Sequence, residues 1–233
     1  MRVAEIFRSL QGEGFLTGTD AVFVRASGCN LRCWFCDTPY ASWLPEGENL
    51  TVDEIVHRAI ALADVPPAAT HVVLTGGEPM LFAELAPLTR QLRNLGWHIT
   101  VETAGTLYLA VECDLMSISP KLSNSTPQRN RDPRWSERHE RTRHVPGVIR
   151  RLIAEYPYQI KFVVDRPEDC LEVEGYLAGF PEIDRAKVLL MPQGTNLAML
   201  AEKEAWLRPY CDEHGVHFCA RRQIEWFGLT RGT

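Results

Sequence analysis

Three cysteines within eight residues are the part of this sequence best suited to chemistry. Cys29, Cys33 and Cys36 follow one another in a C-x₃-C-x₂-C spacing. Thiolates bind zinc or iron–sulfur centres, and a cubane of four irons held by three local cysteines keeps one iron open to another ligand. A structural zinc site normally takes four ligands from paired cysteines, and a second pair is missing, while a redox dithiol would need only Cys33 and Cys36. The spacing therefore favours an iron–sulfur cluster over these two alternatives.

The composition limits the class of protein. The chain has 233 residues, of which 45% are hydrophobic and 24% charged, as is typical of one globular domain over residues 1–233. A formal net charge of −5 gives no general attraction to nucleic acid, so a small-molecule substrate is expected. Neither an apolar signal segment nor a run of about 18 apolar residues occurs, which predicts a cytoplasmic protein without a membrane partner. The remaining cysteines are expected to be buried without chemistry: Cys113, Cys170, Cys211 and Cys219.

Short apolar runs alternate with segments of helical periodicity. Alternation of this kind predicts parallel strands joined by right-handed crossovers, as an open doubly wound sheet or as a full or partial β/α barrel. A capping box, Thr51 with Glu54, opens the first helical segment. The expected strands are 21–24, 72–74, 99–101, 115–118, 160–164, 188–191 and 216–218, and the expected helices are 51–63, 82–95, 145–155, 168–178 and 197–214.

Residues able to do chemistry follow the expected strands. In both architectures the active site lies at the carboxyl ends of the strands. One cofactor site could therefore be reached from all of these segments. They are 25–29, 75–79, 102–105, 119–121 and 191–194.

The segment 122–144 interrupts the alternation with an arginine-rich stretch. It predicts a basic loop or short helical insertion, and a solvated surface loop is the favoured interpretation. A lid or a docking surface for a partner is the alternative. The arginines are Arg129, Arg131, Arg134, Arg138, Arg141 and Arg143.

The cysteine spacing, with the aromatic Phe35 directly before Cys36, resembles the signature of the radical S-adenosylmethionine enzymes, and the likeness extends over nearly the whole chain. The resemblance implies a partial, open β/α barrel with mostly parallel strands. It also implies a [4Fe–4S] cluster with three cysteine ligands, whose fourth iron binds the amino and carboxylate groups of S-adenosylmethionine. An electron from flavodoxin or ferredoxin would then cleave this cofactor to methionine and a 5′-deoxyadenosyl radical. Both donors are acidic, so docking at Arg129, Arg131 and Arg134 is a hypothesis for the basic segment.

The segment Thr75-Gly76-Gly77-Glu78-Pro79 resembles the Gly-Gly-Glu-Pro motif of that superfamily. There, backbone and a carboxylate meet the ammonium of the cofactor, and glycines allow close approach of a ligand. A plain strand-to-helix turn is the alternative reading for this motif, and simple turn roles are the alternative for the later strand ends. By the resemblance, further cofactor contacts come from Phe35, Glu102, Thr103, Ser119, Pro120, Lys121, Met191, Pro192, Gln193 and Gly194.

The stretch from Ile6 to Gly14 narrows the resemblance to the 7-carboxy-7-deazaguanine synthases. That likeness implies conversion of 6-carboxy-5,6,7,8-tetrahydropterin to 7-carboxy-7-deazaguanine with loss of ammonia, in 7-deazapurine biosynthesis of the queuosine type. It further implies that S-adenosylmethionine is regenerated, and a homodimer is expected. The alternatives are a glycyl-radical activating enzyme acting on a protein, and a non-catalytic iron–sulfur or zinc module.

The same likeness implies roles for individual residues. Arg25 would bind the substrate carboxylate through its planar fork, and Thr38 would bind Mg²⁺ together with that carboxylate, with Asp37 as the alternative metal ligand. The tail, residues 220–233, would close on the substrate and bring Thr233 near, unless it simply frays. Contacts with the pterin ring are expected from Leu10, Gln11, Gly12, Glu13 and Thr75.

Overall fold

The computed structural model describes residues 1–63 and 70–233, and within them one sheet of nine strands forms the centre of the molecule. The order across the sheet is β3-β1-β2-β4-β5-β6-β7-β8-β9. The strands are β1 (Arg2–Leu10), β2 (Asp20–Ala26), β3 (Glu48–Asn49), β4 (His71–Gly76), β5 (His98–Thr103), β6 (Leu115–Ile118), β7 (Tyr158–Val164), β8 (Val188–Pro192) and β9 (His217–Phe218).

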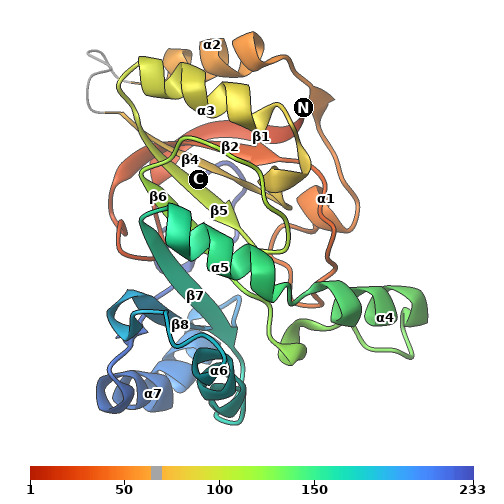
Figure 1. The fold of residues 1–233 in the computed structure, drawn as a ribbon, viewed down its shortest axis with the longest axis vertical. Coiled ribbons are helices and arrows are strands. Elements are labelled where there is room, and N and C mark those ends of the chain that lie inside the picture. Colours follow the sequence, from red (N-terminus) through yellow and green to blue (C-terminus); the bar gives the residue numbers. More distant parts are fainter. Residues whose placement is uncertain (64–69) are drawn as a thin grey trace.

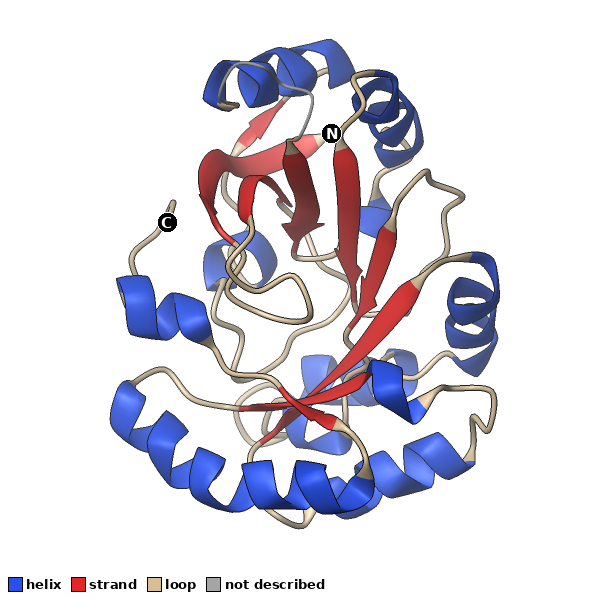
Figure 2. Ribbon diagram, turned by 90° about the vertical axis from the view of Figure 1, so that its left-hand side faces the viewer, coloured by secondary structure: helices blue, strands red, loops and turns tan. Residues whose placement is uncertain are grey.

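The sheet is parallel from β2 to β9 and antiparallel only at β1 and β3. Because the edge strands β3 and β9 do not pair with each other, the barrel stays open. Figure 2 shows the strands fanned into this incomplete barrel with helices outside it, and the C-terminal segment on the side that the longer helices leave uncovered. The predicted open β/α barrel is confirmed, and each expected strand is present.

Helices cover the outer face of the sheet, and the five expected ones are present (Figure 1). The capping box of α2 is formed: Thr51 Oγ1 accepts from Glu54 N at 3.2 Å, and Glu54 Oε2 accepts from Thr51 N at 2.8 Å. The helices are α1 (Pro39–Ser42), α2 (Val52–Leu62), α3 (Leu85–Asn94), α4 (Pro133–Thr142), α5 (Pro146–Glu155), α6 (Asp169–Ala178), α7 (Leu197–His214) and α8 (Arg222–Phe227), with single 3₁₀ turns at Pro79–Leu81, Ser123–Ser125 and Arg185–Lys187.

Alternation along the parallel strands separates the core from the inside of the barrel. In β7, Ile160 and Phe162 are fully buried in the core that the sheet shares with the helices. Lys161 and Val163, which lie between and beyond them, line a central cavity instead. Successive side chains of a strand point to opposite faces, so each polar residue between two apolar ones is directed inward. The inner face of the sheet is therefore where the site lies.

The segment 122–144 is not an irregular loop. It contains a 3₁₀ turn and helix α4, which begins after Asp132, whose side chain accepts from Trp135 N at 3.0 Å, with Pro133 as first helical residue. Of the two expected forms, a basic loop and a short helical insertion, the structure shows the helical one, and the Asp-Pro start is itself a helix signal. The choice between a solvated surface and a docking surface stays a prediction. Figure 1 shows α4 projecting from the barrel.

One buried histidine anchors α4 to the cysteine loop. His139 is fully buried; its Nδ1 accepts from Arg32 N at 3.1 Å, and its Nε2 lies 2.9 Å from Ser125 Oγ. Since Nδ1 is an acceptor, Nε2 carries the proton and donates to the serine. The basic helix is therefore fixed directly beside the loop that carries Cys33.

The remaining cysteines agree in the main with their expected burial. Cys170, Cys211 and Cys219 are buried, whereas Cys113 is partly exposed. Cys219 lies directly after the short strand β9 rather than within it. All seven cysteines are free, and no helix of the described residues is long and apolar enough to cross a membrane.

Candidate active site

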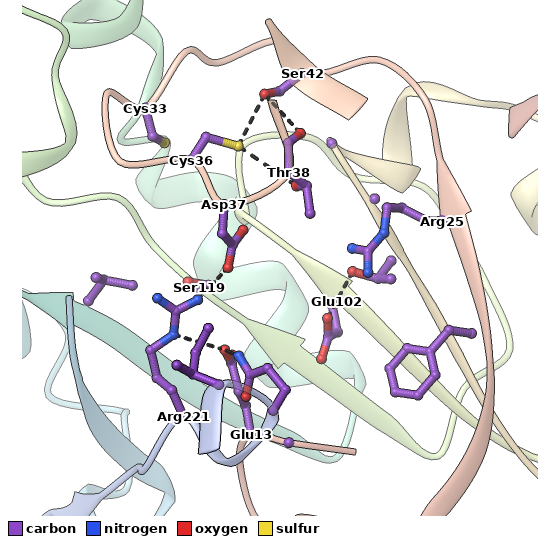
Figure 3. Close-up of a pocket in the computed structure, with 18 of the residues that line it drawn as sticks. Glu13, Arg25, Cys33, Cys36, Asp37, Thr38, Ser42, Glu102, Ser119 and Arg221 are labelled. Carbon is purple, nitrogen blue, oxygen red and sulfur yellow. Dashed lines mark hydrogen bonds and ion pairs between the residues drawn. The ribbon is translucent and has the colours of Figure 1, made fainter. Parts of the chain in front are cut away.

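A cavity of about 320 Å³ opens inside the barrel, within the size range of small-molecule sites. The cysteine loop, the inner faces of the strands, the loop after β1 and the C-terminal tail all contribute to it. Figure 3 shows Cys33 and Cys36 at one end of the cavity and Glu13 at the other. The predicted residues that line it are Leu10, Gln11, Gly12, Glu13, Arg25, Cys29, Cys33, Phe35, Cys36, Thr38, Thr75, Gly76, Gly77, Glu102, Thr103, Ser119, Lys121, Met191, Gln193 and Thr233.

Four predicted site residues do not line the cavity, and Glu78 is the most informative of them. Its side chain is fully buried, and its carboxylate accepts from Met80 N at 3.0 Å, Thr103 Oγ1 at 2.8 Å and Ala104 N at 2.8 Å. Burial raises the pKa of this carboxyl. A carboxylate has about four acceptor positions, so one position on Oε2 remains after these three hydrogen bonds. The other three residues are Pro120, Pro192 and Gly194.

The two glycines after β4 are required by the protein's own backbone. Gly76 has a φ of +142°, and a Cβ there would collide with the backbone of Ala26. A Cβ on Gly77 would collide with the carbonyl of Gly28. The glycines therefore let the end of β4 pack against the start of the cysteine loop, in addition to any approach of a ligand.

Hydrogen bonds to neighbouring groups shape the cysteine loop. The guanidinium of Arg32 donates to Cys29 O at 2.7 Å, the indole of Trp43 donates to Cys33 O at 2.9 Å, and Cys36 Sγ lies 3.1 Å from a serine hydroxyl. Burial raises the pKa of Cys29 to about 11 and that of Cys33 to about 12. The thiols of Cys29 and Cys33 are thus protonated in the absence of metal, and metal binding must release these protons.

The donor set of this loop suits an iron–sulfur cluster, in which each of the three thiolates binds a different iron. The three thiols face one cavity and influence one another electrostatically.

The loop after β1 forms the floor of the cavity from the opposite direction. Because β1 runs antiparallel to β2, its end lies beside the start of β2 rather than beside the cysteine loop. Gly14 N donates to Cys219 Sγ at 3.2 Å, and Phe15 N donates to Gln159 Oε1 at 2.9 Å, so the loop crosses the barrel to its far wall. The expectation that site residues lie at the carboxyl ends of parallel strands does not predict this position.

A hydrogen-bonded chain connects the floor to the strands. Gln11 Nε2 donates to Glu102 Oε1 at 3.2 Å, and Thr75 Oγ1 donates to Glu102 Oε2 at 2.8 Å. The oxygen of the Gln11 amide accepts from Glu13 N at 3.1 Å. Four predicted residues from three separate segments are thereby held in one network.

Glu13 is surrounded by positive charge. It forms an ion pair with Lys161 on β7, its Oε1 accepts from Gln223 at 2.5 Å, and Arg221 Nε lies 3.5 Å away. Burial raises the pKa of Glu13, but the charges of Lys161 and Arg221 outweigh it and lower the pKa to about 2. The carboxylate is therefore ionised at neutral pH and able to accept hydrogen bonds.

Arg221 is a buried residue that the sequence reasoning missed. It forms an ion pair with Asp37 and donates to Gly194 O at 2.5 Å, in addition to its contact with Glu13. One guanidinium thus connects the cysteine loop, the floor and the loop after β8. Asp37, the alternative metal ligand, is occupied by this pairing, whereas the hydroxyl of Thr38 lines the cavity with only a 3.8 Å contact to Cys36.

Comparison with known proteins identifies the family. The model of the radical SAM superfamily matches residues 23–142. A 7-carboxy-7-deazaguanine synthase of Rhodopirellula baltica is 45% identical over 99% of this chain and 88% of its own length, and one of Halobacterium salinarum is 42% identical over 95% and 88%. The chain belongs to the 7-carboxy-7-deazaguanine synthase family, within the radical SAM superfamily.

Solved structures agree on the fold of this family member. The crystal structure of QueE from Escherichia coli superposes with a TM-score of 0.69 at 22% identity, over 95% of this chain and 93% of that one. Streptococcus suis SuiB matches with a TM-score of 0.52 at 14% identity, over 85% of this chain and 48% of its own. At such identities the likeness concerns the open barrel alone.

Proposed function

We propose that this protein converts 6-carboxy-5,6,7,8-tetrahydropterin to 7-carboxy-7-deazaguanine with release of ammonia, as an enzyme of 7-deazapurine biosynthesis. The observation that carries the proposal is that one small cavity holds the three-cysteine loop at one end and the Glu13 network at the other. Relatives that are 45% and 42% identical are named as synthases of the same product, 7-carboxy-7-deazaguanine.

The floor residues suit the pyrimidine part of a pterin. The ionised Glu13 can accept from ring N–H and amino groups, and Gln11 and Thr75 supply further polar contacts beside it. Arg25 faces the same cavity and suits a carboxylate. Leaving the substrate's donors unpaired would cost about 1–3 kcal/mol each, so this floor favours a heterocycle of that pattern.

We place the iron–sulfur cluster and S-adenosylmethionine at the end of the cavity that carries the cysteine loop. Cys29, Cys33 and Cys36 would hold the [4Fe–4S] cluster, and S-adenosylmethionine would lie along the strand ends that carry Gly77 and Met191. When bound, the two together supply the one-electron chemistry that starts the ring contraction. Enclosure by the barrel and the tail keeps water from this reaction.

Mg²⁺ is the third cofactor that we propose, with Thr38 as its protein ligand. The Thr38 hydroxyl lines the cavity between the cysteine loop and Arg25, whereas Asp37 is paired with Arg221. Mg²⁺ commonly keeps several waters and uses few protein oxygens. Such a site is completed only by the substrate carboxylate, so omission of Mg²⁺ should weaken substrate binding more than cofactor binding.

The test is an anaerobic assay of the reconstituted protein with the carboxytetrahydropterin, read by mass spectrometry for 7-carboxy-7-deazaguanine. Loss of a charged hydrogen-bond acceptor costs about 1.5–3 kcal/mol, so E13Q should lower kcat/KM about 10- to 100-fold. E48Q changes an exposed carboxylate in the same way and should leave the rate unchanged. Absence of product from the wild-type protein, with cluster and cofactor bound, would contradict the proposal.

A glycyl-radical activating enzyme and a non-catalytic module are less well supported. An activating enzyme needs a groove for a polypeptide, whereas the tail residues 228–233 line the cavity here and restrict its opening. A zinc or carrier module has no need of the Glu13 network. Cleavage of S-adenosylmethionine only in the presence of a protein substrate would favour the activating enzyme.

We further propose that α4 receives an acidic electron donor of the flavodoxin or ferredoxin type. Arg131, Arg134 and Arg138 are exposed on or beside this helix, and Trp34 of the cysteine loop is 50% exposed next to it, since Trp34 N donates to Ser125 O at 3.1 Å. Opposite charges speed the encounter of two proteins in a salt-dependent manner.

Reversing the charge of the α4 arginines tests whether α4 docks the electron donor or is only a solvated surface. R131E/R134E/R138E should slow reduction by flavodoxin at least tenfold at low salt and leave reduction by dithionite unchanged. R58E/R90E/R208E makes the same change in net charge at exposed positions on α2, α3 and α7 and serves as the control. Equal effects of the two triple variants would exclude α4 as the docking surface. A cytoplasmic homodimer remains our expectation, and light scattering of the purified protein tests the dimer.

A further inference from the structure

We propose that Glu5 is a positioning residue that orients Arg25 toward the substrate carboxylate and couples this orientation to closure of the C-terminal tail through Arg231. The inference rests on the proposed function of the cavity, and it concerns residues that lie on its wall rather than at its centre. Glu5 and Arg25 are direct partners across the antiparallel strands β1 and β2.

The guanidinium of Arg25 is hydrogen-bonded through Nε, and its two terminal nitrogens are available to a ligand. Its Nε donates to Glu5 Oε1 at 2.6 Å, and it lies over the ring of Phe7 at 5.7 Å. The side chains of Arg25 and Glu5 are only 17% and 11% exposed. Among the described residues, Nε is the only side-chain nitrogen of Arg25 with a hydrogen-bond partner. Its two terminal nitrogens therefore remain for a carboxylate, which an arginine fork binds with two parallel hydrogen bonds.

Both oxygens of Glu5 are used. Oε1 also accepts from the hydroxyl of Tyr40 at 2.7 Å, and Oε2 accepts from Arg231 Nε at 3.2 Å. Burial raises the pKa of Glu5, but the hydrogen bonds from Arg25 and Tyr40 lower it by more, so the group stays ionised at neutral pH. One carboxylate is thus shared between an arginine of the cavity wall and an arginine of the tail.

Arg231 fastens the tail across this wall. It donates to Glu46 Oε2 at 2.9 Å and to Ala4 O at 3.2 Å, and its guanidinium lies 4.0 Å from the centre of the Tyr40 ring. The residues on either side of it, 228–233, line the cavity. Arg231 therefore fixes the last residues of the tail to β1 and to Glu46, beside the cavity.

Charge explains why the two arginines are coupled. Arg25 and Arg231 share the buried carboxylate of Glu5, because the other carboxylate at Arg231, Glu46, is exposed to solvent. An arriving carboxylate on the free edge of Arg25 adds a second buried negative charge beside the two arginines. Without Glu5, the guanidinium of Arg25 can rotate, and Arg231 loses the more buried of its two carboxylate partners. Substrate binding and tail closure then stabilise each other, because each one favours the same position of Glu5.

The experiment measures KM, kcat and hydrogen exchange of the C-terminal peptide in E5Q, R231Q, E46Q and E5Q/R231Q. In E5Q we expect KM for the carboxytetrahydropterin to rise at least tenfold with kcat within threefold, and exchange in 228–233 to quicken in the substrate-free protein. R231Q should quicken exchange equally but raise KM only about threefold. E46Q removes an exposed partner of Arg231, 58% exposed, without touching Arg25, and should leave KM within twofold.

The double variant tests the coupling itself. If Arg231 acts on the cavity through Glu5, E5Q/R231Q should raise KM no more than E5Q alone. An unchanged KM in E5Q, or a rise in E46Q as large as in E5Q, would overturn the inference. R231Q alters only an exposed tail residue, so it keeps the test valid should E5Q misfold. Failure of the proposed function is distinguishable, because the wild type would then form no product while the exchange measurements still report on Glu5 and Arg231.

Discussion

At the scale of single residues, the site consists of polar side chains on otherwise apolar strands. Lys161 stands among Ile160, Phe162 and Val163, and Glu102 follows Val101 in the same way. A charged group buried in a strand is costly unless it is paired. Its presence there is thus a signal that the inner face of the barrel is a site.

That pairing predicts a large loss of stability in K161Q. The variant leaves the buried Glu13 carboxylate without its ammonium partner, and breaking a buried pair costs about 3 kcal/mol. Urea unfolding of the apoprotein at neutral pH should show this decrease. The control is R58Q, which breaks an exposed pair with Glu48 and should change stability far less, because solvent screens this pair. Equal effects would mean that the Glu13 pair is as solvated as a surface pair.

The site residues that could be predicted are those that belong to short local patterns in the sequence. The cysteine triplet and the Gln11–Glu13 loop are recognisable as local patterns, and both line the cavity. Arg221 and Glu5 were missed because their roles depend on partners 184 and 20 residues away. Lys161 was open to prediction, since a lysine in a buried strand already indicates a partner of opposite charge.

At the scale of elements, the parallel strands and their helices were predictable from the sequence. The antiparallel pairing of β1 with β2 was not. Apolar runs identify buried strands, but they do not give the direction of β1, which pairs antiparallel with β2. That direction decides which end of the barrel the Gln11–Glu13 loop enters. Helix α8 was not predicted, and for the tail both closure on the substrate and fraying were open, because their order depends on contacts of Arg221 and Arg231 with distant segments.

Where β4 packs against the start of the cysteine loop, we expect that no side chain is tolerated at Gly76. In G76A the new Cβ meets the backbone of Ala26, and the φ of +142° is strained for alanine, at a cost of about 3 kcal/mol. For a domain of this size that lowers Tm by about 10 °C. Differential scanning calorimetry should show the decrease. G147A places a Cβ into open space in α5 and should raise Tm slightly, so a G76A protein as stable as G147A would contradict the packing described.

The anchor of α4 predicts a pH dependence of stability. Burial lowers the pKa of His139 to about 4, so between pH 6.5 and pH 4 the unfolded state binds a proton that the folded state does not. Stability from this group is complete above pH 6.5 and falls as the pH decreases. By pH 5 the loss is about 2 kcal/mol.

Urea unfolding of wild type and H139Q at several pH values measures this loss. The difference in stability between them should shrink by about 2 kcal/mol from pH 7.5 to pH 5, since contributions of other groups cancel. H57Q removes an exposed histidine of α2 and should keep a constant difference from wild type. A constant difference for H139Q as well would mean that His139 is not held neutral by burial.

At the scale of the whole molecule, three parts of the open barrel lie at different sides of the cavity: the cysteine loop with α4, the loop after β1, and the C-terminal tail. The cysteine loop and α4 lie at one end of the cavity, where an electron would enter, and the loop after β1 closes the other end. The tail lies across the side that the longer helices leave free (Figure 2). An incomplete barrel is suited to this arrangement, because a closed one would fill its centre with side chains.

Anaerobic turnover with both products quantified tests the proposed reaction most directly. The reconstituted protein would receive S-adenosylmethionine, Mg²⁺, reduced flavodoxin and 6-carboxy-5,6,7,8-tetrahydropterin. We expect 7-carboxy-7-deazaguanine to accumulate in clear excess over methionine, as it would if the cofactor is regenerated in each cycle, which the resemblance to the family implies. Methionine and 5′-deoxyadenosine formed without any deazaguanine would contradict the assignment and leave only radical generation to this cavity.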